Sequence, residues 1–313
     1  MTDLSLPALV LGTIRRRCLW GRGAEIVIAV SGGGDSVALM HLLSELAPRL
    51  ALTLRVASVD HGLRLESADE VRMVGVEAAR LGLPFTPIKL ELAEGANVQA
   101  RGREARYASL HALAKETGAF VALGHTLDDQ AETVMGRILR GAGLRGLGGV
   151  QPQRDDGVVR PLIDVRRDAL RAYLCAKGAS WVEDPSNELE RFERVRIRRA
   201  LATFESEDPK LSVHLAELAD DAREAHEVLE SLASALGPEL DSLAHAPSAV
   251  RRVAIRRLAE GKLGKGVRRR HLEDLERCVL SRTGEVLLGG GWRASPRDGV
   301  LHFEKGDWSG RSG

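Results

Sequence analysis

The stretch from Ile26 to Leu43, IVIAVSGGGDSVALMHLL, constrains the fold of this chain more than any other. It opens with a short apolar run that suits a buried strand and is too short to form a helix by itself. After the loop, apolar residues recur at the spacing of one helix face. The stretch predicts a strand, a glycine-rich turn and a helix N-terminus. The turn consists of Ser31, Gly32, Gly33, Gly34, Asp35 and Ser36.

Such a turn suits a phosphate group. The first N–H groups of a helix lack a carbonyl partner within the helix, and the helix dipole adds positive potential there. No lysine follows the glycines, so the turn is not the GxxxxGK[ST] loop that grips β- and γ-phosphates. Asp35 stands there instead, and a carboxylate beside a polyphosphate indicates Mg²⁺ between them. On the turn alone, a purely steric use of glycine stays open.

Strand-like and helical patterns alternate over the first half of the chain. Strands are predicted at 52–60, 85–92 and 120–124, and helices at 67–81, 97–117 and 125–139. This order predicts an α/β fold, with a doubly wound, mostly parallel sheet covered by helices on both faces. Because the carboxyl ends of parallel strands meet at one edge, the polar groups that follow the strands are expected to share one site.

Two of those polar groups have specific expectations. Asp60 follows a strand and is placed to meet an adenosine ribose or base, although an aspartate can also simply turn the chain. If Thr126 caps the next helix, Asp129 and Glu132 lie one turn apart on one face. Two such carboxylates can hold Mg²⁺ or an ammonium group. The alternative is that acidic residues merely favour the first turn of a helix.

Charged residues are unevenly distributed along the chain, although its net charge is only +1. Residues 137–200 hold 14 Lys/Arg against 9 Asp/Glu, residues 201–244 hold 2 against 11, and residues 245–313 hold 15 against 8. Basic surfaces of this kind indicate a nucleic-acid partner. Solvated charged faces are the alternative. The arginines of the glycine-punctuated segment 137–149 suit phosphate contacts, namely Arg137, Arg140 and Arg145. The alternative is that this segment is a mobile surface loop.

The 313 residues suggest more than one domain. We expect a catalytic domain at 1–200, an acidic helical spacer at 201–244 and a small basic α+β domain at 245–313, with strand-like segments at 285–288 and 300–303. No apolar run approaches the length of a bilayer span, and three cysteines far apart in the sequence indicate a reducing compartment. The expected location is therefore the cytoplasm, with no membrane partner. The oligomeric state stays open, with a homodimer as one candidate.

The Ser-Gly-Gly-x-Asp-Ser turn resembles the signature of the PP-loop (N-type) ATP pyrophosphatases, which have a Rossmann-like fold. A narrower resemblance, over about residues 25–305, is to the short form of the tRNA(Ile)-lysidine synthases. LDDQAET together with the glycine- and arginine-rich segment is its specific part. The motifs are SGGGDS (31–36), VDHGLR (59–64), GHTLDDQAET (124–133), RILRGAGLRGLGG (137–149), RPL (160–162) and WVEDPSN (181–187).

This resemblance implies a ligase that forms a C–N bond in a tRNA. ATP would adenylate O2 of the wobble cytidine in a tRNA(Ile) with the anticodon CAU. Free L-lysine would then displace AMP at C2 through its ε-amine, giving lysidine, AMP and pyrophosphate. The implied partners are tRNA(Ile) and L-lysine, and the implied cofactors are ATP, as a substrate, and Mg²⁺.

The resemblance also implies roles for single residues. The turn 31–36 would hold pyrophosphate, with Asp35 as the metal ligand, while Asp60, His61 and His125 would bind ATP. Arg106 matches the active-site arginine of the family. Asp129 and Glu132 would hold the amine groups of lysine, and with Asp35 and Arg106 they form the predicted catalytic set. The arginines expected to bind tRNA are Arg137, Arg140, Arg145, Arg194, Arg198, Arg268, Arg269 and Arg270.

The sequence departs from the family pattern at Val195, where an asparagine is expected in the RNxIR motif. This departure puts one hydrogen bond in doubt. Two rival functions stay open from the sequence. One is a PP-loop tRNA thiolase, which generally needs cysteines to carry sulfur, and the other is a small-molecule ligase of the amidotransferase type. A non-catalytic nucleotide sensor is a third reading, which the presence of Asp35, Asp129 and Glu132 disfavours.

Overall fold

The structure, a computed structural model, describes residues 5–60, 62, 67–90, 98–183 and 193–306. The chain forms two compact units, Met1–Asp220 and Asp221–Gly313. The boundary between the two units falls inside the long helix α9 (Leu211–Ser234). The predicted domain limits at residues 200 and 244 stay a prediction.

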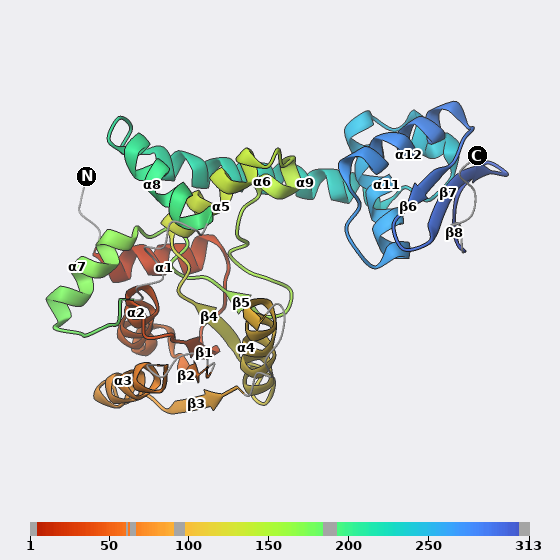
Figure 1. Cartoon of the computed structure of the whole chain (residues 1–313). Helices are drawn as coiled ribbons and strands as arrows, with labels where there is room; N and C mark the ends of the chain where they lie inside the picture. The colour runs from red at the N-terminus through yellow and green to blue at the C-terminus, as the bar shows by residue number, and fades with distance from the viewer. Residues whose placement is uncertain (1–4, 61, 63–66, 91–97, 184–192, 307–313) are drawn as a thin grey trace. The chain divides into compact units, whose positions relative to one another are not determined.

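The first unit is built around a parallel sheet of five strands in the order β3-β2-β1-β4-β5 (Figure 1). Chain order and spatial order reverse beside β1, since β1 pairs with β2 on one side and with β4 on the other. Ligand sites of open α/β sheets lie at such a point, at the carboxyl ends of the strands. The strands are β1 (Glu25–Ala29), β2 (Thr53–Asp60), β3 (Phe85–Lys89), β4 (Phe120–Leu123) and β5 (Val158–Val159).

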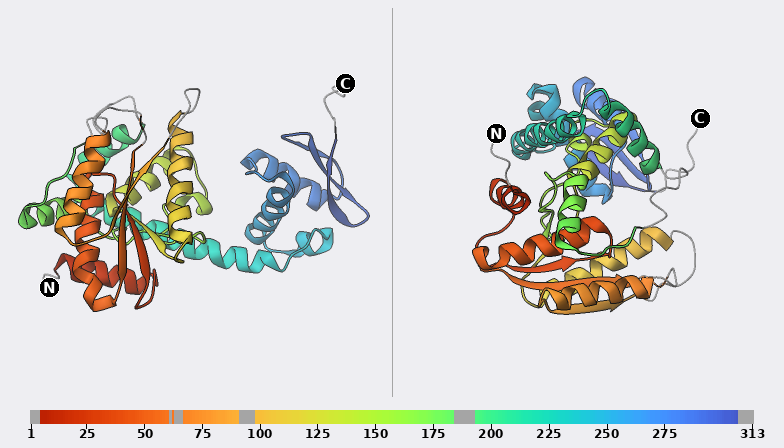
Figure 2. Two further views of the ribbon diagram at one scale, coloured as in Figure 1. Left: turned by 90° about the horizontal axis from the view of Figure 1, so that it is seen from below. Right: turned by 90° about the vertical axis from the view of Figure 1, so that its left-hand side faces the viewer.

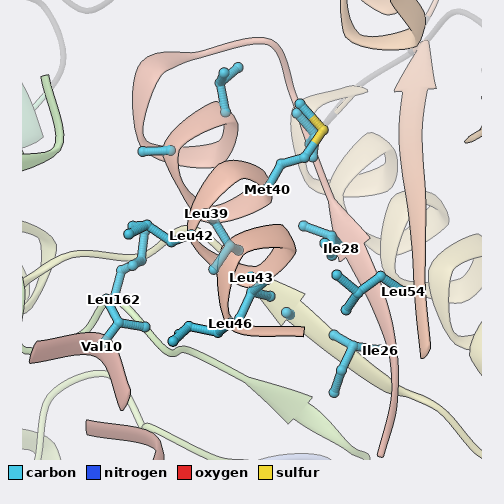
Figure 3. Packing of buried hydrophobic residues seen from close by; sticks show 14 of the residues in the cluster. Val10, Ile26, Ile28, Leu39, Met40, Leu42, Leu43, Leu46, Leu54 and Leu162 are labelled. Atoms are coloured by element: carbon cyan, nitrogen blue, oxygen red, sulfur yellow. The ribbon is translucent and has the colours of Figure 1, made fainter. Parts of the chain in front are cut away.

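Alternate residues of β1 enter different cores because successive side chains of a strand point to opposite faces. Ile26 and Ile28 pack with α2 in the larger core, which Figure 3 shows from close by. Val27 packs with Leu110 of α4 on the other face. The views in Figure 2 agree with this layering of helices on both sides of the sheet. The larger core is lined by α1 (Leu6–Arg16), α2 (Gly34–Leu50), α3 (Ser67–Arg80) and α7 (Arg167–Lys177), and the smaller one by α4 (Val98–Lys115).

A third apolar cluster joins three helices of the first unit that lie beyond the sheet. Ala131 and Val134 pack against Ile197, Leu201 and Leu215. The first turns of α9 are therefore part of the first unit. The helices concerned are α5 (Leu127–Leu139), α8 (Glu193–Glu205) and α9, and a short helix, α6 (Leu144–Leu147), follows α5.

The second unit combines the end of α9 and three further described helices with an antiparallel sheet in the order β6-β7-β8. Its own core contains Leu243, Ile255, Leu275 and Leu288, so it is built as a small α+β domain. The elements are α10 (Leu240–His245), α11 (Ser248–Leu263), α12 (Arg269–Ser281), β6 (Val286–Leu288), β7 (Trp292–Arg297) and β8 (Val300–Lys305).

The predicted doubly wound α/β fold with a small α+β domain is confirmed. The predicted helices at 67–81 and 125–139 correspond to α3 and α5 within one or two residues. Two strands were not predicted: β5 has only two residues, and β7 contains Pro296, which is unfavourable inside a strand. None of the described helices combines the length and the apolar composition that crossing a membrane requires.

Candidate active site

The glycine-rich turn 31–36 joins β1 to α2 at the carboxyl edge of the sheet (Figure 1). Gly32 has a φ of +89°, a conformation open to glycine because it lacks a Cβ. The Ser36 hydroxyl donates to the Gly33 carbonyl at 2.8 Å and accepts from the Ser31 N–H at 3.1 Å. The turn is thus fixed from within. The Ser36 N–H donates to the Gly33 carbonyl at 3.1 Å, whereas the N–H groups of Gly34 and Asp35, at the start of α2, have no helical acceptor.

Two other segments hold the turn from outside. The Val182 N–H donates to the Gly32 carbonyl at 2.9 Å. At the end of β4, a Cβ on Gly124 would lie 3.1 Å from backbone atoms of Asp35 and Ser36. Because Gly124 has no side chain, the start of α5 can lie close to the glycine-rich turn.

The start of α5 carries the predicted acidic pair. Thr126 and Asp129 form a capping box, in which the Thr126 N–H donates to Oδ2 of Asp129 at 2.8 Å and the Asp129 N–H donates to Oγ1 of Thr126 at 3.3 Å. This cap confirms the predicted helix start and fixes the Asp129 carboxylate. Glu132 follows one turn later on the same face, and its side chain is only 2% exposed.

One guanidinium joins these carboxylates to the glycine-rich turn. Nε of Arg167, at the start of α7, donates to Oδ2 of Asp35 at 3.1 Å. Its other nitrogens contact Oδ1 of Asp129 at 2.8 Å and Oε1 of Glu132 at 3.5 Å. The Arg167 N–H also donates to Oδ2 of Asp128 at 2.7 Å. Three predicted site carboxylates, from α2 and α5, therefore meet on one cation.

Two arginines of α8 contact the same carboxylates from another direction. Arg194 donates to Oε2 of Glu132 and to Oδ1 of Asp129, both at 2.6 Å, and Nε of Arg198 donates to Oε1 of Glu132 at 2.7 Å. The Arg194 side chain is 54% exposed, whereas the Glu132 side chain is almost fully covered. Solvent reaches this ion pair from the arginine side.

Their surroundings raise the pKa of Asp35 and lower the pKa of Asp129. Burial raises the pKa of Asp35, and the nearby carboxylates of Asp129 and Asp128 raise it further, against the effect of Arg167. Burial also acts to raise the pKa of Asp129. There Arg194, Arg167 and the Thr126 N–H outweigh it and hold the pKa below its usual value. Neighbouring carboxylates with separated pKa values are typical of functional sites.

His125 is neutral at ordinary pH and has a defined tautomer. Burial, followed by the charge of Arg160, lowers the pKa of His125 to about 4. Nε of Arg160 donates to Nδ1 of His125 at 3.3 Å. Nδ1 must therefore be the unprotonated nitrogen, which leaves the ring proton on Nε2. His125 can donate one hydrogen bond through Nε2 to a bound nucleotide.

Arg106 differs from the arginines that contact Asp129 and Glu132. Among the residues that the structure describes, it has no carboxylate partner, and its guanidinium lies 5.8 Å from the centre of the Tyr107 ring. Burial lowers the pKa of Arg106, and the nearby Arg103 adds to this effect. A half-buried cation without a counter-ion suits an anionic ligand such as a phosphate group.

Asp60 and His61 were predicted to meet the adenosine. Asp60, at the end of β2, accepts from the Gly62 N–H at 2.8 Å and from the Ser67 hydroxyl, so it also shapes the start of α3. His61 lies outside the described residues.

The arginines predicted to bind tRNA are divided between the two units. In the first unit, Arg137 donates to the carbonyls of Gly146 and Gly149, and Arg140 pairs with Glu193 at 2.6 Å. The side chain of Arg145 is exposed, and Arg194 and Arg198 contact the acidic pair of α5. In the second unit, three exposed arginines lie at the start of α12, namely Arg268, Arg269 and Arg270.

Sequence reasoning missed Arg167, the cation at the centre of the site. Its signal is weak because Arg166 and Arg167 stand at the start of an ordinary amphipathic helix, where basic residues are common. Arg160 lies within the RPL motif, where the sequence does not distinguish it from other arginines, although it is 4% exposed and contacts His125. Val195, at the departure from the family pattern, is a buried apolar residue of α8.

A family model described as a PP-loop domain matches residues 17–204. The curated tRNA(Ile)-lysidine synthase of Ruegeria pomeroyi is 52% identical over a match that covers 56% of this chain and 43% of that protein. The tRNA(Ile)-lysidine synthase of Methylobacterium nodulans is 36% identical over 99% of this chain and 97% of its own length. This second match extends through both compact units.

Among solved structures, a tRNA thiolase from Methanococcus maripaludis has a TM-score of 0.60 at 18% identity, covering 70% of this chain and 78% of that one. At this identity the likeness concerns the fold alone. The chain spans 43%, 64% and 56% of the length of three curated relatives, from Ruegeria pomeroyi, Solibacter usitatus and Thermus thermophilus. The glycine-rich turn and its acidic partners agree with the PP-loop match, and the similarity to the Methylobacterium nodulans protein extends over nearly the whole chain. The chain therefore belongs to the tRNA(Ile)-lysidine synthase family of PP-loop proteins.

Proposed function

We propose that this chain ligates L-lysine to C2 of the wobble cytidine in a tRNA(Ile) with the anticodon CAU. The observation that supports this most is the meeting of Asp35, Asp129 and Glu132 on Arg167 beside the glycine-rich turn. One site of this kind could hold both a polyphosphate and an amine nucleophile. Family membership indicates which polyphosphate and which amine.

The first step is adenylation of the base. O2 of the cytidine attacks the α-phosphorus of ATP, and the bond from that phosphorus to the bridging oxygen breaks, releasing pyrophosphate. The N–H groups of residues 32–35 and the hydroxyls of Ser31 and Ser36 are proposed to hold the pyrophosphate. Such preorganised donors stabilise the negative charge that develops as the bond breaks.

The second step is attack by the amine. The ε-amine of lysine forms a bond to C2, the C2–O2 bond breaks, AMP leaves with that oxygen, and the nitrogen loses a proton. Asp129 and Glu132 are proposed to bind the ammonium groups of lysine, since in the structure they already bind cationic nitrogens. Lysine would then replace part of the contacts that Arg194 and Arg198 make with these carboxylates.

Arg106, His125 and Asp60 are proposed to bind the nucleotide. Arg106 has a half-buried guanidinium without a carboxylate partner among the described residues, which suits the α-phosphate. His125 offers Nε2–H as a donor because its Nδ1 faces Arg160. Asp60, at the end of β2, is proposed to contact the adenosine.

Asp35 fits a role as a ligand of Mg²⁺. Mg²⁺ prefers oxygen ligands and is usually held by one or two carboxylates together with substrate phosphates. Asp35 offers such an oxygen within the glycine-rich turn, while the described residues contain no group of three or more His, Cys, Asp or Glu side chains that could hold a metal alone. When bound, the ion would neutralise charge on the phosphates.

The second unit is proposed to bind tRNA through the exposed Arg268, Arg269 and Arg270. Exposed arginines supply the sequence-independent part of RNA affinity by pairing with phosphates. We expect the reaction to take place in the cytoplasm, where tRNA is modified.

Incorporation of labelled lysine into bulk bacterial tRNA, with ATP and Mg²⁺, tests the proposal. Label that resists mild alkali is expected, because a C–N bond to the base survives alkali whereas aminoacyl esters are cleaved. If ATP is cleaved to AMP in the presence of tRNA but no lysine is retained, the lysine assignment fails and another nucleophile, such as a sulfur donor, must be sought. Lysine retained on tRNA without ATP would contradict the adenylation step.

A further inference from the structure

Three arginines surround the ring of Tyr107, and in the described part of the chain none of them contacts Asp35, Asp129 or Glu132. The guanidinium groups of Arg103, Arg106 and Arg154 lie 5.2, 5.8 and 5.4 Å from the centre of the Tyr107 ring. Arg103 and Arg106 lie on α4 with Tyr107, while Arg154 comes from the turn before β5. We call Tyr107 and these three arginines the tyrosine–arginine cluster. Each contact is a cation–π interaction, which is stronger for guanidinium groups that are partly shielded from water.

The charge of this cluster is poorly balanced. Among the residues that the structure describes, the carboxylate that pairs with it is Asp156, which lies 2.5 Å from Arg154 and 3.3 Å from His111. Arg103 contacts the Tyr107 hydroxyl at 3.4 Å instead of an acid. Concentrated like charge destabilises a folded protein unless an anion binds there. The excess of guanidinium groups therefore points to an anionic ligand.

Arg160 connects the cluster to the proposed nucleotide site. Its guanidinium interacts with the Tyr107 side chain on one side and donates to Nδ1 of His125 on the other. It is also fixed by the Gln151 carbonyl, to which it donates at 2.5 Å. A ligand on Tyr107 is therefore one buried side chain, that of Arg160, away from His125.

The chemistry of the cluster favours single-stranded RNA over a simple polyanion. Aromatic rings and guanidinium planes stack on unpaired bases, while the guanidinium edges bind phosphates. The Tyr107 ring is half-buried, and the Arg103 side chain next to it is exposed. A bound base could replace one of the guanidinium groups that now cover the ring.

We infer that the tyrosine–arginine cluster is a docking platform for an unpaired nucleotide of the RNA strand that carries the modified base. Tyr107 would stack on the base, and Arg103 and Arg154 would bind the flanking phosphates. This inference rests on the proposed function, because it takes the anticodon loop of a tRNA as the ligand. It makes Tyr107, Arg103 and Arg154 a specificity element that acts on a neighbouring nucleotide, while Arg106 keeps its proposed role at the α-phosphate.

The chain offers a matched control for a test. It contains two tyrosines, and the other, Tyr173 on α7, also carries a cation–π contact, with Lys177 at 5.3 Å, and donates to Glu45. The substitutions Tyr107→Leu and Tyr173→Leu therefore remove equivalent groups from different surfaces. Tyr107→Phe keeps the ring and removes only the hydroxyl.

Affinity for an anticodon stem-loop RNA, for heparin and for ATP should be measured for the three variants and the unaltered chain. Tyr107→Leu is expected to weaken RNA binding about tenfold, the usual size of one lost base stack. ATP binding, heparin binding, the Tyr107→Phe variant and the Tyr173→Leu variant should stay near the unaltered values. Arg103→Gln and Arg154→Gln should each reduce the salt dependence of RNA binding by about one unit of slope.

Other results would overturn the inference. If Tyr107→Leu binds RNA as tightly as the unaltered chain, the cluster is not a docking platform. The same conclusion follows if Tyr173→Leu weakens RNA binding as much as Tyr107→Leu does. If Tyr107→Leu loses heparin affinity to the same extent as RNA affinity, the cluster binds polyanions in general and does not recognise an unpaired base. Parallel loss of ATP affinity shows that the ring only supports Arg160 and His125. The proposed function fails separately, if the unaltered chain forms no alkali-stable lysine adduct.

Discussion

Nε of Arg167 donates to Oδ2 of Asp35 across 3.1 Å, and this hydrogen bond joins residues 132 positions apart. It connects the start of α7 to the glycine-rich turn at the start of α2. The same guanidinium reaches Asp129 and Glu132 on α5. Arg167 thus compensates three carboxylates that would otherwise repel one another in a partly buried site.

Replacing Arg167 with glutamine should destabilise the fold as well as impair the reaction. Removal of the cation leaves partly buried carboxylates without their charged hydrogen-bond partner, at a cost of about 2–3 kcal/mol in the free energy of unfolding. Urea unfolding of the variant measures this loss. Arg171→Gln, one turn further along α7 on an exposed side chain, is the matched control and should change stability by less than about 0.5 kcal/mol. Equal stability of both variants would show that Arg167 is not needed as a counter-ion.

Replacing Asp35 with asparagine should abolish turnover while RNA affinity stays nearly unchanged. The proposed metal ligand is lost, and a decrease of kcat by at least about 100-fold is expected. Asp168→Asn, at an exposed position in the first turn of α7, serves as the control. Release of pyrophosphate and filter binding of tRNA measure the two properties. An active Asp35→Asn enzyme would rule out the proposed metal role.

Replacing Glu132 with glutamine should affect lysine more than ATP. The variant keeps the shape of the side chain but removes the charge that now binds Arg194 and Arg198. The KM for lysine is expected to rise about tenfold or more, since a charged hydrogen bond contributes roughly 1.5–3 kcal/mol. Adenylation of tRNA without lysine should persist. A loss of adenylation equal to the loss of ligation would place Glu132 in the first step instead.

The pKa of His125 predicts how stability depends on pH. The folded-state pKa of about 4 lies below the ordinary value of 6.5, so the unfolded chain binds more protons between these values. The stability contributed by the neutral ring is therefore complete above about pH 6.5 and is lost as the pH falls toward 4. His125→Gln should remove this component, which is on the order of 2–3 kcal/mol.

Urea unfolding at pH 7 and pH 5 measures this component, as the difference between the unaltered chain and His125→Gln. His41 is also buried with a lowered pKa and acts in the same direction, so only this comparison isolates His125. The unaltered chain should lose more stability between the two pH values than the variant does. The same loss in both would mean that His125 keeps its ordinary pKa in the folded protein.

Reversing the charge of Arg268, Arg269 and Arg270 should weaken tRNA binding without changing ATP binding. All three side chains are exposed at the start of α12, so the substitutions should leave the core of the second unit intact. The slope of log affinity against log salt should become less steep by up to about 3, one for each phosphate that is no longer neutralised. Unchanged tRNA affinity would remove this helix start from the RNA path.

Much of the fold followed from local patterns. The run Ile26–Val30, the glycine turn and the apolar spacing of α2 predicted β1, its loop and its helix. Thr126 with Asp129 three residues later predicted the cap of α5, which the structure confirms. Elements with little local signal escaped prediction: β5 has two residues and is held by its neighbour β4.

The site divides in the same way. Asp35, Asp129 and Glu132 could be selected from the sequence because they follow strand ends, and the topology of a parallel sheet brings strand ends together. Arg167 and Arg160 could not, because nothing in their local sequence distinguishes them from ordinary surface arginines. Their importance comes from partners that are distant in the chain, such as Asp35 for Arg167 and His125 for Arg160.

By itself, then, the sequence determined most of the secondary structure, the parallel sheet and the edge of that sheet where the candidate site lies, since these depend on apolar periodicity and glycine spacing. Only the tertiary structure decided which cation stands between Asp35 and Asp129, and which arginines gather on Tyr107. The physical reason is that charge pairing acts over a few ångströms in space and carries no period along the chain. Pairing partners therefore become visible only when the helices have packed.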